Sequence, residues 1–397
     1  MKPIQHASVP PLAREESADG HVKNAGGRQK AHRAVASYFC RENAGPNGHE
    51  CLTQCALARR LAALKGVDYA GLHPPGEAHD GSMYMVPSDT LSAADAARLG
   101  VTCEHDLFGG VVPHFFASTK VITHDLPQPG KSPAPAQWSS RFPAAVRAAV
   151  LPGFTVFSIE DALHAGELLL RDGPVRLKKP SGIGGLGQSV AGDAQELRAQ
   201  LQAIDPARLA QEGLVLEHNL VEVDTCSVGQ VVIAGMVATY CGTQRLTRSN
   251  RGQEVYGGSS LLVARGGFDA LLSLPLEPHM HTAIEQSRIY HAAALAAFPG
   301  MFVSRSNYDI AQGRDAGGIF HSGVLEQSWR IGGASGAEIA ALEAFAADPG
   351  LRAVRASTTE VYGKSPDLPR DALVYFQGED EKIGHITKYS RIAHADT

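Results

Sequence analysis

The order of apolar and polar residues predicts short helices and strands that follow one another along the chain. Apolar side chains recur at helical spacing from about 31 to 64, and Gly66 ends this predicted helical stretch. A strand is predicted over 82–87 and a helix over 92–99. Helices that alternate with short strands indicate a small α/β domain over 31–118.

Two segments interrupt this pattern. Residues 125–136 contain four prolines, a density that neither a helix nor a central strand tolerates. We therefore predict a linker or surface loop there. Residues 1–30 are polar and show no periodicity, so we expect a flexible leader.

Beyond the proline-rich segment the pattern predicts a second series of elements. Ser158, with Asp161 three residues later, has the form of a capping box at the start of a helix. Two strands are expected to pair antiparallel around Gly235. Helices are predicted over 143–150, from 158, over 194–203 and over 282–298, and strands over 155–157, 175–178, 214–217, 227–234, 236–242, 303–310 and 323–327.

Composition and charge exclude several classes of protein. The 397 residues are 44% hydrophobic and 19% charged, which is ordinary for a globular chain of two or three domains. A net charge of -5 does not favour nucleic-acid binding, which needs a basic surface. We see no apolar run of membrane-spanning length and no secretory signal, and six cysteines do not make a disulfide framework. We therefore expect a cytoplasmic protein with neither a membrane nor a nucleic acid as partner.

The most distinctive local feature is a glycine-rich loop directly after a predicted strand. The strand ends at Lys178, and Lys179-Pro180-Ser181 leads into Gly-Ile-Gly-Gly-Leu-Gly at 182–187. Backbone N–H groups in such a loop can converge on phosphate oxygens, and a lysine adds positive charge beside them. The loop matches neither the Walker A pattern nor the dinucleotide fingerprint. A glycine-rich hairpin without a ligand is the alternative interpretation.

A second candidate region is the segment that leaves the predicted strand 214–217. Glu217 ends this strand, and Asn219 and Leu220 follow. The backbone of such a connecting segment can offer N–H and C=O groups to the edge of an adenine ring. Asp224, seven residues after Glu217, can reach ribose hydroxyls. An acidic turn without a ligand is again the alternative.

Two predicted strands in the last third of the chain carry a pair of carboxylates. Asp309 lies in the first and Glu326 in the second, with a glycine-containing turn over 312–318 between them. A hairpin of these strands would bring the two acids near each other, and Ser328 shares a face with Glu326 by the period of two. Carboxylate oxygens are hard ligands that suit a Mg²⁺ ion bridging phosphates. A solvent-exposed turn with scattered acids is the alternative.

Taken in this order, these features resemble the ATP-grasp superfamily over roughly residues 110–345. In that family an early lysine, a strand lysine before a glycine loop, an acidic hinge and a metal-binding Asp and Glu follow one another. The resemblance implies an α+β ATP-grasp fold, in which two α+β subdomains clasp ATP, preceded by a small α/β domain. It implies a leader over 1–30, an N-terminal domain over 31–118 and an ATP-grasp domain over 119–397, with the nucleotide-clasping subdomain at about 150–220. The whole chain also resembles a bacterial family of unknown function, a likeness that adds no activity.

The resemblance carries over to individual residues. Lys120 takes the position of the early lysine, and the choice between Lys178 and Lys179 for the second stays open. Ser328 stands where the family has asparagine, which leaves a second metal position open. The implied nucleotide-binding residues are Lys120, Lys178, Lys179, Gly184, Gly185, Gly187, Glu217, Asn219, Leu220 and Asp224, and the implied metal ligands are Asp309, Glu326 and Ser328.

The activity that the resemblance implies is that of an ADP-forming ligase with ATP and one or two Mg²⁺ ions as cofactors. Such an enzyme activates a small-molecule carboxylate as an acylphosphate, which an amine, a thiol or a similar nucleophile then attacks. The implied catalytic residues are Arg330, Arg305 and Lys179, with Arg330 stabilising charge on the acylphosphate or holding the substrate carboxylate. The alternatives are an ATP-dependent small-molecule kinase and a non-catalytic ATP-binding protein that keeps the fold. The resemblance also allows a homodimer.

One further region suggests a substrate site. Arg245, Arg248 and Arg251 lie within a predicted loop over 244–258, between the hinge strands and the strands that carry the acids. Arginines in an active-site loop could bind an anionic substrate. A solvent-exposed basic loop is the alternative.

Overall fold

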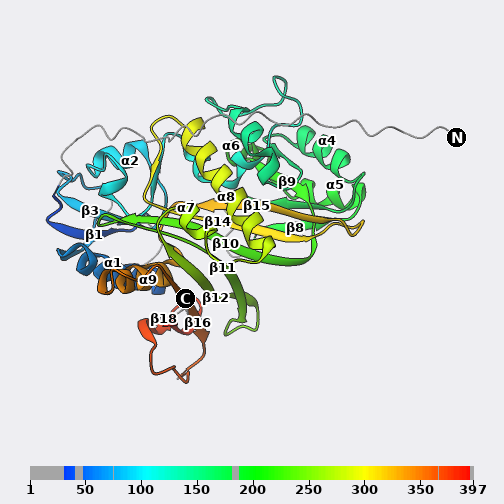
Figure 1. Cartoon of the computed structure of the whole chain (residues 1–397). Helices are drawn as coiled ribbons and strands as arrows, with labels where there is room; N and C mark the ends of the chain where they lie inside the picture. Colours follow the sequence, from blue (N-terminus) through cyan, green and yellow to red (C-terminus); the bar gives the residue numbers. More distant parts are fainter. Residues whose placement is uncertain (1–30, 41–47, 75, 181–186, 365, 394–397) are drawn as a thin grey trace, which may run out of the picture. The chain divides into compact units, whose positions relative to one another are not determined.

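Four β-sheets and the helices that cover them make up the described part of the chain (Figure 1). The computed structural model describes residues 31–40, 48–74, 76–180, 187–364 and 366–393. The expected leader over 1–30 and the loop residues Gly184 and Gly185 therefore lie outside the described residues. None of the helices within these ranges has the combination of length and apolar character that a bilayer-spanning helix needs.

Three parallel strands form the first sheet. β1 (Ala34–Tyr38) lies between β2 (Asp68–His73) and β3 (Met83–Pro87) and pairs with both. The helix α1 (His49–Lys65) ends at Gly66, as predicted. The expectation of helical spacing from about 31 is wrong for β1. A central parallel strand is buried along most of its length, so it lacks the polar alternation that identifies a strand.

A second sheet links the N-terminal region to a much later part of the chain. β5 (Gly110–Val112) pairs with β4 (Leu91–Ser92) on one side and with β13 (Phe302–Val303) on the other. The helix α2 (Ala93–Arg98) follows β4, and the Ser92 hydroxyl accepts a hydrogen bond from the backbone N–H of Asp95. The predicted helix over 92–99 is thus confirmed.

Short helices connect this region to the third sheet. The 3₁₀ helices η2 (Phe115–Ser118) and η3 (Lys120–Thr123) precede the proline-rich segment. Residues 125–136 contain neither helix nor strand, as predicted. The other short elements are η1 (Glu104–Asp106), α3 (Arg141–Val146) and η4 (Arg147–Ala149).

The third sheet is small and antiparallel, and its three α-helices cover one face. Its strands β6 (Gly153–Val156), β9 (Leu214–His218), β7 (Val175–Lys178) and β8 (Gln188–Ala191) lie in that order, and its helices are α4 (Ile159–Leu169), α5 (Ala194–Gln202) and α6 (Pro206–Glu212). Leu177 and Leu216 pack in one apolar cluster with residues of α4 and α5. Because side chains alternate across a strand, Lys178 and Glu217 lie on the opposite face. The small sheet therefore presents a polar face.

The fourth sheet has eight strands in the order β15-β14-β10-β11-β12-β16-β18-β17. Its hairpin around Gly235 is confirmed. The sequence patterns did not predict β12, β16, β17, β18 or α9. The strands are β10 (Val221–Ile233), β11 (Met236–Arg248), β12 (Glu254–Arg265), β14 (Arg305–Arg314), β15 (Phe320–Ser328), β16 (Ala353–Tyr362), β17 (Leu373–Asp380) and β18 (Gly384–Ala393), and the helices are α7 (Phe268–Leu272), α8 (Pro278–Ala297) and α9 (Ser335–Ala347).

Helices cover both faces of this large sheet (Figure 1). Tyr290 of α8 packs with Val228 and Tyr308 on one face. The neighbouring helices α1 and α9 pack on the other face, where Tyr240 belongs to their apolar cluster. Asp309 follows Tyr308 along β14, so its side chain is directed to the face of α1 and α9.

Candidate active site

Lys178 and Glu217 form a buried ion pair on the polar face of the small sheet. The Nζ atom of Lys178 lies 2.8 Å from Oε1 of Glu217, and the two side chains are 2% and 1% exposed. The same ammonium group donates a hydrogen bond to the carbonyl oxygen of Leu325 at 3.3 Å. Because Leu325 belongs to β15, Lys178 joins the small sheet to the edge of the large one.

The neighbouring lysine has a different environment. Lys179 is exposed, and its backbone N–H donates a hydrogen bond to the carbonyl oxygen of Gly187 at 3.0 Å. Gly187 has a φ of 77°, a conformation that glycine adopts without strain. Of the two lysines, only Lys178 is directed toward the junction of the two sheets.

His124 contacts the second oxygen of the Glu217 carboxylate. Its Nε2 atom lies 3.3 Å from Oε2 of Glu217, and both side chains are buried. Gly153 makes room for this contact, because a Cβ atom there would lie 2.9 Å from Nε2 of His124. Burial raises the pKa of the Glu217 carboxyl, but the charge of Lys178 and the contact with His124 outweigh burial and lower this pKa to about 2. Glu217 is therefore ionised at neutral pH.

The other candidate nucleotide residues make contacts that do not involve this pair. Nη2 of Arg176 donates to Oδ1 of Asn219 at 2.6 Å, and Nη1 donates to Oε1 of Gln188 at 3.0 Å. Leu220 is buried in a small apolar cluster. Asp224 is exposed in the first part of β10. Arg176 of β7 thus holds the Asn219 side chain beside the small sheet.

The two candidate metal acids come together across a strand pair. Asp309 of β14 lies directly opposite Glu326 of β15, and Asn307 lies opposite Ser328. The hairpin that the sequence predicted is confirmed. The two carboxylates share the edge of the large sheet that Lys178 reaches through Leu325.

Three side chains donate hydrogen bonds to one oxygen of Asp309. Ser227 Oγ lies 3.2 Å, Gln244 Nε2 2.8 Å and Asn307 Nδ2 2.9 Å from Oδ1 of Asp309. Burial and the charge of Glu326 raise the pKa of Asp309 to about 6, although the hydrogen bonds from Asn307 and Ser227 oppose this shift. A nearby cation would favour the ionised form.

Lys120 lies beside the other acid, Glu326. Its Nζ atom lies 2.5 Å from Oε2 of Glu326; Lys120 is 4% exposed, whereas Glu326 is 34% exposed. The amide of Gln327 donates to the carbonyl oxygens of Ala117 and Thr119 at 3.2 and 2.9 Å. These bonds hold η2 and η3 against β15 and so keep Lys120 beside Glu326.

The donor set at this edge fits a magnesium ion that also binds phosphate. The oxygens of Asp309 and Glu326 are hard ligands, and Mg²⁺ commonly uses one or two carboxylates together with substrate phosphates. Across the described ranges, no group of three His, Cys, Asp or Glu side chains could hold a metal. The hydroxyl of Ser328 accepts a long hydrogen bond from Arg305, 3.4 Å from Nη1.

The two arginines proposed from the sequence differ in their surroundings. Arg305 is buried and donates to Glu338 of α9, with Nη2 2.6 Å from Oε1. Its Nη1 also donates to the carbonyl oxygens of Ser328 and Arg330, at 3.2 and 2.6 Å. Arg330 is half-buried and donates from Nη1 to the carbonyl oxygen of Ile331 at 2.7 Å.

Sequence comparison identifies the family. The family model described as "Protein of unknown function (DUF3182)" matches residues 38–390. The chain belongs to the DUF3182 family. No curated protein sequence matches this DUF3182 protein.

Several solved structures are similar to this DUF3182 protein. The biotin carboxylase domain of Hydrogenobacter thermophilus 2-oxoglutarate carboxylase, in complex with MgADP, ADP and bicarbonate, is 13% identical and matches 90% of this chain and 86% of that one, with a TM-score of 0.51. Phosphoribosylamine–glycine ligase from Thermotoga maritima is 13% identical over 92% and 93% of the two chains, with a TM-score of 0.48. D-alanyl-alanine synthetase A from Vibrio cholerae is 9% identical over 75% and 89%, with a TM-score of 0.40. The DUF3182 protein has the α+β ATP-grasp fold that its sequence predicted.

The three arginines of the expected substrate loop bind main-chain carbonyl groups in the DUF3182 protein. Arg245 donates to Thr358 at 3.0 Å, Arg248 to Gly252 at 3.2 Å and Arg251 to Lys382 at 2.9 Å. The expectation of a loop over 244–258 is wrong for most of its length. The hairpin of β11 and β12 continues to residues 248 and 254, because the two strands pair almost without interruption.

Sequence reasoning missed several residues of this site. Asn307 lies two positions before Asp309, so the period of two in a strand could have identified it. Ser227 and Gln244 reach Asp309 from β10 and β11. Their positions depend on strand register, which the sequence did not fix. We find no local sequence signal for His124.

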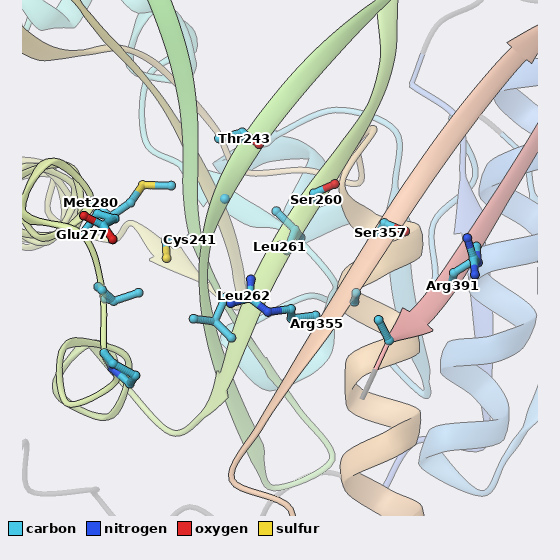
Figure 2. Close-up of a pocket in the computed structure, with 15 residues that line it drawn as sticks. Cys241, Thr243, Ser260, Leu261, Leu262, Glu277, Met280, Arg355, Ser357 and Arg391 are labelled. Carbon is cyan, nitrogen blue, oxygen red and sulfur yellow. The ribbon is translucent and has the colours of Figure 1, made fainter. Parts of the chain in front are cut away.

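A cavity of about 530 Å³ lies on the other face of the large sheet (Figure 2). Figure 2 shows Glu277 and Met280 across from Leu262 and Arg355. Cys241 also lines it, in the apolar cluster beneath α8. None of the candidate nucleotide or metal residues lines this cavity.

Proposed function

We propose that this DUF3182 protein is an ATP-dependent ligase that activates a small-molecule carboxylate as an acylphosphate. An amine or a similar nucleophile is the second substrate, and ADP and phosphate are the other products. One observation carries the proposal: two buried lysines, Lys120 and Lys178, each contact a carboxylate where the small sheet meets β15. Phosphoryl transfer depends mainly on positioning and charge, which these groups can supply.

In this proposal Lys178 is the nucleotide lysine and Lys179 is not. The buried, ionised Glu217 holds the Lys178 ammonium, which also donates a hydrogen bond to β15. This arrangement supports Lys178 over Lys179, the two lysines between which the sequence left the choice open. Gly187, next to β8, and Asn219 and Leu220, directly after β9, would line the rest of the nucleotide.

Asp309 and Glu326 are the proposed magnesium ligands. A bound Mg²⁺ ion would neutralise phosphate charge and so assist transfer of the γ-phosphoryl group. Glu326 is the more exposed of the two acids and already lies beside a cation, Lys120. The Lys120 ammonium, beside Glu326, would add positive charge for the same phosphate.

The proposed reaction has two steps. A carboxylate oxygen of the substrate forms a bond to the γ-phosphorus while the bond to the β–γ bridging oxygen breaks, and ADP leaves. The nucleophile then attacks the acyl carbon, phosphate leaves with the bonding electrons, and the nucleophile loses a proton. Arg330 is the residue we propose for the substrate carboxylate or the acylphosphate. Arg305 supports the site from within the protein, because Glu338 and two carbonyl groups occupy its donors.

Nucleotide binding is the first test. ATP, ADP and GTP are added with and without Mg²⁺, and the melting temperature is measured, because a ligand of the native state raises it. We expect a shift that is selective for adenine nucleotides and larger with Mg²⁺. Lys178→Met should remove most of this shift, and the matched variant Lys179→Met should retain it. No shift at millimolar nucleotide would overturn the proposal.

Chemistry is tested with hydroxylamine as the nucleophile. Candidate carboxylates are screened with ATP and Mg²⁺, and ADP and hydroxamate are measured together. A ligase that forms an acylphosphate yields both products, whereas a small-molecule kinase yields ADP without hydroxamate. Nucleotide binding without ADP from any carboxylate would favour the non-catalytic alternative.

A further inference from the structure

A chain of polar contacts leads from helix α9 to the Asp309 carboxyl. The hydroxyl of Tyr240 lies 2.6 Å from Oε1 of Glu338 and 2.9 Å from Oδ1 of Asn307. The side-chain amide of Asn307 in turn donates to Oδ1 of Asp309 at 2.9 Å. The tyrosine hydroxyl has one proton and donates it to one acceptor at a time, but its oxygen lies within hydrogen-bond distance of both Glu338 and Asn307.

The residues at both ends of this series of contacts, Glu338 and Asp309, have several hydrogen-bond partners. Glu338 accepts hydrogen bonds from Nε and Nη2 of Arg305, and both side chains are almost fully buried. At the other end, Ser227 and Gln244 donate to the same oxygen of Asp309 as Asn307 does. Buried charges with several partners have few alternative arrangements.

The backbone of β10 is shaped to admit the tyrosine. Gly229 lies opposite Tyr240 on one side and Asn307 on the other. A Cβ atom at Gly229 would lie 2.4 Å from the hydroxyl oxygen of Tyr240 and 2.3 Å from the carbonyl oxygen of Ser306. The tyrosine can therefore reach across β10 to Asn307 only because this position has no side chain.

We propose that Tyr240 and Asn307 are positioning residues for the divalent ion. Within the described chain, the hydrogen bonds to the Asp309 carboxyl all end at Oδ1, so Oδ2 is the oxygen that remains for a ligand. Tyr240 and Asn307 limit rotation of this carboxyl and link it to α9. The inference rests on the proposed function, because it takes Asp309 as a metal ligand.

Mn²⁺ is the probe for this inference, with ADP as the nucleotide so that no turnover occurs. The affinity of the ADP complex for Mn²⁺ is measured by electron paramagnetic resonance, and ADP affinity is measured separately without metal. Residues that orient metal ligands typically change metal affinity by 10- to 100-fold when replaced. Tyr240→Phe should weaken Mn²⁺ binding about 10-fold and leave metal-free ADP binding unchanged.

Tyr308→Phe is the matched control. Tyr308 is also a fully buried tyrosine of the large sheet, but its hydroxyl contacts His291 and Trp329 on the opposite face. This variant loses a buried hydroxyl without touching the Asp309 contacts, so its Mn²⁺ affinity should match the wild type. If Tyr240→Phe does not fold, Asn307→Ala carries the same test and should weaken Mn²⁺ binding at least as much.

The outcomes separate this inference from the proposed function. If the wild type binds ADP without Mn²⁺ tightening the complex, the metal assignment fails and the inference fails with it. If the wild type binds Mn²⁺ with ADP but Tyr240→Phe and Tyr308→Phe behave alike, only the positioning role is overturned. A selective loss of Mn²⁺ affinity in Tyr240→Phe supports both.

Discussion

Two lysine–carboxylate pairs meet at the junction of the small and large sheets, and they differ in how closed they are. In the pair of Lys178 and Glu217 both side chains are buried, and His124 contacts the second carboxylate oxygen. In the pair of Lys120 and Glu326 the lysine is equally buried, but a third of the carboxylate is exposed. We call the first the sealed pair, because both of its side chains are buried, and the second the open pair, because its carboxylate reaches solvent.

This difference predicts that the two pairs contribute differently to the free energy of unfolding. Removing one member of a sealed pair leaves a buried charge without a partner, which costs far more than the pair itself contributes. An exposed carboxylate can exchange its partner for another cation at little cost, because water already solvates it. We therefore expect the sealed pair to govern stability and the open pair to govern metal binding.

Removal of the sealed lysine should have the largest effect. Lys178→Met leaves the Glu217 carboxylate buried without its cation, and we expect a loss of about 3–5 kcal/mol in the free energy of unfolding. Urea denaturation measures this loss. The double variant Lys178→Met/Glu217→Leu should recover most of the stability, because it removes both charges. A single variant that loses less than about 1 kcal/mol would mean that the pair is not sealed.

Acid should weaken the sealed pair within a defined range of pH. The pKa of Glu217 is lowered from its usual 4.5 to about 2, so between these values the unfolded chain takes up a proton that the native protein does not. The stability that Glu217 contributes is complete above pH 4.5 and is lost as pH falls toward 2. The stability difference between wild type and Glu217→Gln should therefore shrink by about 1.4 kcal/mol per pH unit below 4.5. A difference that stays constant from pH 7 to pH 3 would contradict the assignment.

The open pair should matter less for stability than the sealed pair. We expect Glu326→Gln to cost less stability than Lys178→Met, because the glutamine amide oxygen can still accept a hydrogen bond from the buried Lys120. The variant should remove the Mg²⁺-dependent part of the ATP-induced rise in melting temperature. Glu343→Gln is the matched control, because Glu343 is 33% exposed and pairs with Arg60 elsewhere. The control should lose similar stability and retain the Mg²⁺ effect. If both variants retain it, Glu326 is not a metal ligand.

The arginines of the β11–β12 hairpin should have the smallest effect. Arg251 is exposed and donates to a single carbonyl group, so Arg251→Ala should change the free energy of unfolding by about 0.5 kcal/mol or less. Its affinity for ATP, measured by titration calorimetry, should match the wild type. Weaker ATP binding in this variant would show that the β11–β12 hairpin takes part in nucleotide binding.

The sequence predicted the parts of the site that depend on local geometry. The proximity of Asp309 and Glu326 follows from a hairpin, in which a short turn fixes the partners. The contact between Lys120 and Glu326 joins residues far apart in the chain, so no local spacing could reveal it. The contact between His124 and Glu217 also joins residues far apart in the chain, so local spacing could not predict it either.

Two of the elements that the sequence did not reveal, β1 and α9, have no clear period. β1 is buried along most of its length and therefore shows no alternation. Helix α9 is buried around nearly its whole circumference and so lacks a polar stripe. Tertiary packing, rather than local preference, determines such segments.

The short helix η3 has a consequence for how the family can vary. Lys120 begins η3 and contacts Glu326 of the large sheet, and His124 directly follows η3 and contacts Glu217 of the small one. One inserted or deleted residue between them would turn one side chain by about a third of a helical turn away from its partner. We therefore expect relatives of different length to differ in the proline-rich segment at 125–136, while the spacing from Lys120 to His124 stays the same.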